Sequence, residues 1–150
     1  MTPVTPSRLA YGCMRIAADR ERGKRAVLAA ADAGYTLFDH ADIYASGKCE
    51  ELFGEVLRES PGLRDRILVQ GKCGIRLATG DAPQNYDFSR EYLARSVEGI
   101  LSRLGIEYLD YLLLHRPDYL MNAHDLESPG LRPQPSFVAV FVDKDSDKVY

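Results

Sequence analysis

Three ionisable side chains lie where apolar runs of the sequence end. Asp39, Lys72 and His115 each close such a run, and Tyr44 follows Asp39 by five positions on the loop that leaves the same run. In barrel enzymes the C-terminal ends of parallel strands share one mouth, where catalytic side chains gather. If the runs are strands, the four side chains would meet there and could donate a proton to a substrate.

The chemistry of such a group depends on how the tyrosine is activated. A tyrosine hydroxyl ionises near pH ~10, so it is a poor acid at neutral pH without a neighbouring cation. Lys72 could supply that cation, Asp39 could hold the lysine charged and oriented, and His115 could donate a hydrogen bond to a substrate carbonyl. Each residue also has an ordinary structural interpretation as a solvated strand boundary, a packed tyrosine or a hydrogen-bonded histidine, and spacing alone leaves both open.

The elements that would position these residues alternate in type. Strand-like runs alternate with segments of helical spacing, and Asp19 and Ser89 are suitable N-caps. Gly34 and Gly105 stand where two of the helices should stop. We predict strands over residues 9–16, 36–39, 67–69 and 108–114, helices over 19–33, about 52–57 and 89–104, and a polar loop over 75–88.

This order, β-α-β-α-β-α-β through about residue 118, predicts parallel strands joined by right-handed crossovers. The pattern does not separate a closed barrel from an open doubly wound sheet. A (β/α)8 barrel usually takes about 250 residues, and this chain has 150. We therefore expect about four β/α units, which cannot close a barrel alone.

The regular alternation ends after Asp118. Residues 122–126 could begin a helix, but Pro129 and Gly130 interrupt it. We expect the tail over residues 119–150 to be largely irregular, with one strand over residues 137–142.

Composition excludes several functional classes. The sequence has 19 basic and 22 acidic residues and a net charge of -3. It therefore gives no reason to expect nucleic-acid or membrane-surface binding. No apolar run is long enough for membrane insertion, and the N-terminus lacks a signal-peptide core. Three cysteines are too few for a disulfide framework, which favours a cytoplasmic protein.

Two other site types are disfavoured by spacing. The cysteines Cys13, Cys49 and Cys73 with His40 do not have metal-ligand spacing, so we expect no metal site. The segment 46–49 lacks the first glycine and the Ser or Thr of a phosphate-binding loop.

Longer motifs resemble a known family. Residues 34–44, GYTLFDHADIY, with 49–54, CEELFG, resemble the first signature of aldo-keto reductases. Residues 70–74, QGKCG, are similar to the lysine strand of that family, and 112–118, LLLHRPD, to its histidine strand. Residues 9–15 resemble its first strand. The resemblance covers about residues 8–125 and includes all four catalytic positions in order.

The resemblance implies a fold, a reaction and roles. The fold is a parallel (β/α)8 barrel of TIM type, of which residues 1–118 would form the N-terminal half. The reaction is hydride transfer between NADPH and an aldehyde or ketone, with Tyr44 as proton donor, Lys72 and Asp39 as its tuning residues and His115 orienting the carbonyl. The cofactor contacts implied are Gly12, Cys13, Met14, Arg15 and Asp39.

The family's remaining cofactor contacts come mostly from strands 5–8, which this chain does not contain. Two hypotheses therefore stand. The chain belongs to an NADPH-dependent carbonyl reductase, assembled from two half-barrels or supplied with only part of one, or it is a truncated, non-catalytic fragment or interaction module. Exposed sheet edges would favour self-association. The substrate is not specified by the residues present.

Overall fold

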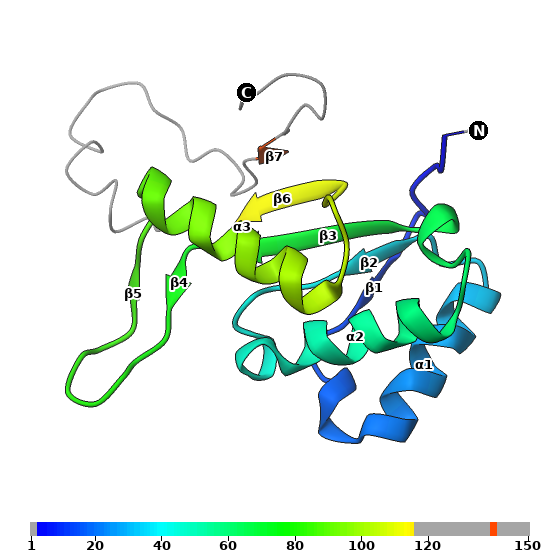
Figure 1. The fold of residues 1–150 in the computed structure, drawn as a ribbon, viewed down its shortest axis with the longest axis horizontal. Helices are drawn as coiled ribbons and strands as arrows, with labels where there is room; N and C mark the ends of the chain where they lie inside the picture. Colours follow the sequence, from blue (N-terminus) through cyan, green and yellow to red (C-terminus); the bar gives the residue numbers. More distant parts are fainter. Residues whose placement is uncertain (1–2, 116–138, 141–150) are drawn as a thin grey trace.

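The computed structural model describes residues 3–115 and 139–140, and its central feature is a five-stranded sheet (Figure 1). Its strands are β1 (Ala10–Gly12), β2 (Leu37–Asp39), β3 (Leu68–Cys73), β6 (Tyr111–Leu114) and β7 (Ala139–Val140), in the order β1-β2-β3-β6-β7. The first four pair in parallel, and β7 pairs antiparallel with β6. The parallel α/β architecture confirms the predicted fold class.

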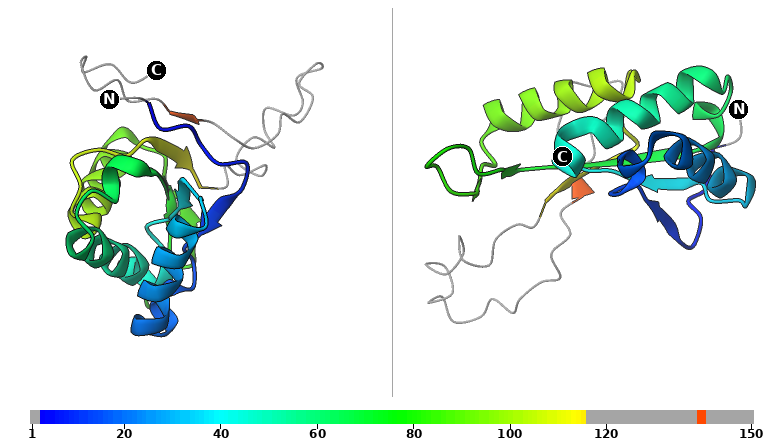
Figure 2. Two further views of the ribbon diagram at one scale, coloured as in Figure 1. Left: turned by 90° about the vertical axis from the view of Figure 1, so that its right-hand side faces the viewer. Right: turned by 90° about the horizontal axis from the view of Figure 1, so that it is seen from below.

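Three helices lie on one side of this sheet (Figures 1 and 2). They are α1 (Arg20–Asp32), α2 (Lys48–Glu59) and α3 (Arg90–Leu104), with short 3-10 turns η1 (Ile16–Ala18), η2 (Tyr44–Gly47) and η3 (Arg64–Arg66). The Asp19 and Ser89 side chains cap α1 and α3 as predicted, and each accepts a hydrogen bond from the backbone N–H three positions on. No helix among the described residues is long and apolar enough to cross a membrane.

The apolar core lies between the sheet and the helices. In β3 burial alternates strictly, so that Val69, Gly71 and Cys73 face the helices. Phe38 of β2 does the same, and its ring lies 5.3 Å from that of Phe53 on α2. The other side of each strand forms the second face of the sheet, which carries every second residue: Leu37 and Asp39, Leu68, Gln70 and Lys72, and Tyr111 and Leu113.

Several predicted boundaries differ from the structure. The strand expected over 9–16 is confined to β1, because the chain turns into η1 and buries Ile16. The third strand extends to Cys73, so Lys72 lies within it. The fourth strand is shorter than predicted and begins at Tyr111. The side chain of the preceding residue, Asp110, accepts a hydrogen bond from the backbone N–H of Val69.

The predicted loop over 75–88 and the tail also need correction. A short antiparallel pair, β4 (Ile75–Arg76) and β5 (Asn85–Tyr86), forms inside that loop, which reads as irregular in sequence because its turn is polar. Of the strand predicted over 137–142, residues 139–140 form β7. The helix start over 122–126 lies outside the described residues.

Close packing of α2 on α3 generates the first prediction. A Cβ atom on Gly54 would lie 2.6 Å and 2.7 Å from the backbone oxygens of Arg103 and Leu104. Gly54→Ala should therefore lower the free energy of unfolding by about 1–3 kcal/mol, the usual cost of overpacking. Urea denaturation measures this, with Gly12→Ala as the control, since no atom lies within 4 Å of a Cβ there. Equal stability of the two variants would contradict the packing argument.

Candidate active site

An ion pair joins the ends of two neighbouring strands. Lys72 Nζ donates to Asp39 Oδ1 at 2.5 Å, and Gln70 Nε2 donates to the same oxygen at 2.5 Å. The side chains of Lys72 and Asp39 are only 12% and 23% exposed, so solvent screens the pair weakly. The pairing follows from the strand register, in which Asp39 lies opposite Gln70. Asp39 thus holds a charged lysine in one place on the second face of the sheet.

Two further predicted residues lie beside this pair. The Lys72 ammonium is 5.2 Å from the centroid of the Tyr44 ring. The rings of Tyr44 and His115 meet edge to face, with centroids 6.2 Å apart. His115 directly follows β6 and its backbone N–H donates to the Cys73 carbonyl at 2.8 Å. The structure therefore brings all four predicted catalytic side chains together in one cluster, hereafter the tyrosine cluster.

The backbone around Tyr44 is tightly constrained. The N–H of Tyr44 donates to the Ala41 carbonyl at 3.0 Å, and the N–H of Asp42 donates to the Lys72 carbonyl at 3.0 Å. The three residues after Tyr44 all have left-handed backbone angles: Ala45 at φ 49, Ser46 at φ 55 and Gly47 at φ 87. Such angles are costly for residues with a side chain and persist only when neighbouring structure fixes them.

The predicted cofactor residues lie in two different environments. Gly12 pairs with Asp39 in the sheet, and the N–H of Cys13 donates to the Asp39 carbonyl at 2.9 Å. The Cys13 side chain is fully buried in the core and is therefore not accessible to a cofactor. Met14 is 51% exposed.

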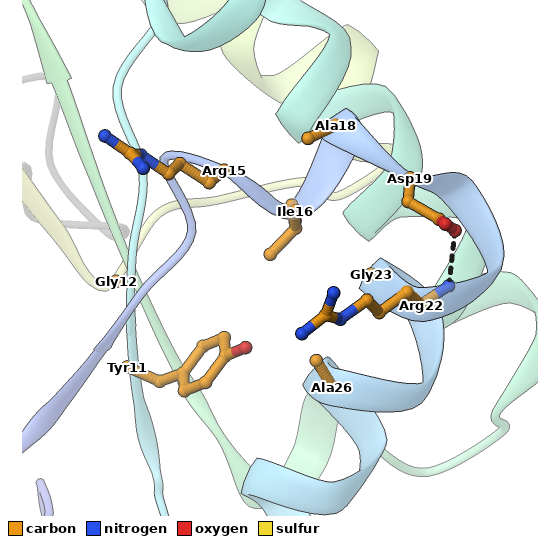
Figure 3. Close-up of a pocket in the computed structure, with 9 residues that line it drawn as sticks. All are labelled: Tyr11, Gly12, Arg15, Ile16, Ala18, Asp19, Arg22, Gly23 and Ala26. Atoms are coloured by element: carbon orange, nitrogen blue, oxygen red, sulfur yellow. Dashed lines mark hydrogen bonds between the residues drawn. The ribbon is translucent and has the colours of Figure 1, made fainter.

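Gly12 and Arg15 also line a pocket of about 460 Å³ between β1 and α1 (Figure 3). The side chains of Tyr11 and Arg22 point into this pocket, whereas that of Arg15 points away. None of the four residues of the tyrosine cluster lines it. The pocket is therefore a cavity separate from the tyrosine cluster.

A second polar group, which the sequence reasoning did not identify, lies on the helix side of the sheet. The Glu50 side chain is 0% exposed and accepts from Arg103 Nε at 2.6 Å. Asp42 interacts electrostatically with both. Burial, followed by the charge of Glu50, raises the pKa of Asp42 to about 6. Glu50 appeared in the sequence only as part of a family motif, and no sequence pattern pointed to Arg103.

His40, next to Asp39, points into the core. It is 0% exposed and its ring meets Phe53 at 4.5 Å. Burial, and then the charge of Lys72, lowers the pKa of His40 to about 3. The histidine is thus neutral at physiological pH. No cluster of three metal-ligating residues forms within the described part of the chain.

Comparison with known proteins places the chain in a family. The family model described as "Aldo/keto reductase family" matches residues 8–132. The chain therefore belongs to the aldo/keto reductase family of oxidoreductases. The match extends beyond residue 125, where the sequence resemblance was expected to end, and includes the first part of the predicted tail.

Individual relatives agree. The chain is 47% identical over 95 residues to the uncharacterized oxidoreductase YcsN of Bacillus subtilis, which is 61% of this chain and 32% of that protein. The holo form of aldo-keto reductase AKR11C1 from Bacillus halodurans superposes with a TM-score of 0.68 at 29% identity, over 80% of this chain and 39% of that one.

An aldo-keto reductase from Klebsiella pneumoniae, solved in complex with NADPH, has a TM-score of 0.56 at 30% identity, over 73% of this chain and 35% of that one. The chain spans between about 30% and 43% of the length of the curated relatives it matches. It therefore corresponds to part of a barrel.

The opposite pKa shifts of His40 and Asp42 generate a prediction about stability. The folded pKa of His40 lies below its ordinary 6.5, so its contribution to stability falls as pH drops from 6.5 towards 3. The folded pKa of Asp42 lies above its ordinary 3.8, so its contribution rises as pH drops from about 6 towards 4. Between pH 4 and 6 the two contributions oppose each other.

Asp42→Asn should remove the contribution to stability that rises as the pH is lowered. Between pH 6 and 4, the free energy of unfolding of this variant should therefore fall by up to about 1.4 kcal/mol more for each unit of decrease in pH than that of the unaltered chain. His40→Asn, the matched variant, should change the slope in the opposite sense. Denaturant titrations at several pH values between 4 and 6 measure both slopes. Parallel pH profiles for all three proteins would show that neither group is perturbed by folding.

Proposed function

We propose that this chain carries the proton-donating part of an NADPH-dependent reductase of aldehydes or ketones, with Tyr44 as the general acid. The observation that carries the proposal is the Lys72–Asp39 ion pair, whose ammonium lies 5.2 Å from the Tyr44 ring centroid. A cation so placed favours the phenolate that remains when a tyrosine gives up its proton. If these residues were only solvated strand boundaries, the lysine, the carboxylate and the tyrosine would have no reason to converge.

Each residue then has a separate task. Lys72 stabilises negative charge developing on the Tyr44 oxygen, and Asp39 keeps the lysine oriented by a charge-assisted hydrogen bond. Gln70, which also donates to Asp39, fixes the carboxylate. His115, whose ring meets that of Tyr44 edge to face, would donate to the carbonyl oxygen of the substrate and so hold it near the tyrosine.

The end of β1 offers room for a nicotinamide. No atom lies within 4 Å of the position that a Cβ on Gly12 would take, and Gly12 pairs with Asp39 in the sheet. Gly12, the backbone of Cys13, Met14, Arg15 and Asp39 would border the cofactor there. When bound, NADPH supplies the hydride that reduces the carbonyl carbon. The solved NADPH complex among the similar structures supports the choice of cofactor.

The three cysteines are all free and buried. Free thiols are typical of a reducing compartment, and we therefore propose that the protein acts in the cytoplasm on a small carbonyl substrate, with no nucleic-acid partner.

The test of the proton donor is Tyr44→Phe. Carbonyl reduction should fall at least about 10²-fold, the scale of a lost general acid. Rates are measured with NADPH and a panel of aldehydes and ketones, for the chain alone and for the chain mixed with the second half of a related barrel. Lys72→Met is the companion variant, and the alkaline limb of its pH–rate profile should move to higher pH. Near-normal reduction by Tyr44→Phe would remove Tyr44 from the mechanism.

A further proposal concerns assembly. Among the described residues β1 pairs only with β2, so one sheet edge exposes backbone hydrogen-bonding groups. The second face of the sheet also has no helix over it in the described part of the chain (Figure 2). We expect the isolated chain to self-associate and to bind NADPH weakly. Sedimentation and NADPH fluorescence titration measure these properties, and a monodisperse monomer with micromolar affinity would contradict the expectation.

A further inference from the structure

Tyr44, whose ring lies 5.2 Å from the Lys72 ammonium, is followed directly by an unusual turn. Ala45, Ser46 and Gly47 adopt three successive left-handed conformations, and α2 begins directly afterwards. Local preferences oppose such a run, since two of the three residues carry a Cβ. Contacts from outside the turn must therefore stabilise it.

One such contact comes from α3. A Cβ on Gly47 would lie 2.7 Å from Cδ and 2.8 Å from Nε of Arg103, so the arginine side chain lies directly against the glycine backbone. On its other side a Cβ on Gly99 would lie 2.9 Å from Arg103 Nη1. Two residues without side chains thus make room for one arginine.

The arginine is fixed by a buried carboxylate at the same nitrogen, Nε, that lies against Gly47. Its Nε donates to Glu50 Oε2 at 2.6 Å, and Glu50 is fully buried on the first turn of α2. A buried carboxylate is strongly destabilising without its cation, so this pair holds together. The guanidinium therefore links α3 to the start of α2 and presses on the last residue of the turn.

We infer that Arg103 is a positioning residue for Tyr44, acting through its contact with Gly47 and its ion pair with Glu50. The inference rests on the proposed function only in so far as Tyr44 donates the proton. The placement of the tyrosine ring by Arg103 is a structural statement that can be tested without turnover.

The chain offers a matched control. Arg64 Nη2 binds Asp110 Oδ2 at 2.8 Å, with side chains 19% and 15% exposed, and lies near the start of β3 rather than at its end. Arg64→Met thus removes another partly buried arginine–carboxylate ion pair, at the opposite end of the strand. It should lower stability without acting on the turn after Tyr44.

The experiment records 19F NMR spectra of the chain labelled with 3-fluorotyrosine. The Tyr44 resonance is the one absent from Tyr44→Phe. Arg103→Met should shift or broaden it far more than Arg64→Met does. Arg103→Lys keeps a cation for Glu50 and so protects folding. Its charge lies only one bond beyond the position of Nε, so the lysine should replace the arginine in part and give a smaller shift than Arg103→Met.

The double variant Arg103→Met with Glu50→Gln removes the uncompensated charge and should not restore the resonance. Any of three results would overturn the inference: an unshifted Tyr44 signal in both Arg103 variants, an equal shift in Arg64→Met, or full recovery in the double variant.

Activity gives an independent readout. In whichever assembly reduces carbonyls, Arg103→Met should lower kcat by about 10–100-fold and leave KM for NADPH unchanged, the pattern of a misplaced acid. If no assembly is active, the proposed function fails while the NMR result still decides the role of Arg103.

Discussion

The register between β2 and β3 is the constraint on which the candidate site depends. Asp39 lies opposite Gln70, so Lys72, two positions further along the same face, reaches back to the carboxylate. A slip of one residue would move Lys72 to the helix side and bring Cys73 to the second face. The buried alternation of β3, with Val69 and Cys73 in the core, opposes that slip. The register that buries these core residues is therefore also the register that places the ion pair.

The same alternation creates two polar environments of different character on either side of one strand. On the second face Lys72 and Asp39 form a partly exposed pair of opposite charges. On the helix side Cys73 lies near Asp42 and Glu50, and burial together with these carboxylates raises the pKa of the thiol to about 12. Cys73 is therefore a protonated, inert packing residue, although it adjoins the lysine in sequence.

The sequence predicted the order of elements and the convergence of Asp39, Tyr44, Lys72 and His115, because strand ends and helix caps have strong local signals. It did not predict that Asp42, Glu50 and Arg103 meet. That contact joins residues more than fifty positions apart, and nothing in the residue types of α3 separates Arg103 from a solvated arginine. The left-handed turn could not be predicted either, since Ala45 and Ser46 have no local preference for the positive φ angles that they adopt.

The Glu50–Arg103 pair has a consequence for recombination among relatives. One accommodating crossover point is the turn between β4 and β5, residues 77–84, because all of its residues are exposed. A crossover there inherits Glu50 from one parent and Arg103 from the other. A chimera joined at this loop therefore keeps the ion pair only when the parent of its N-terminal part carries Glu50 and the parent of its C-terminal part carries Arg103.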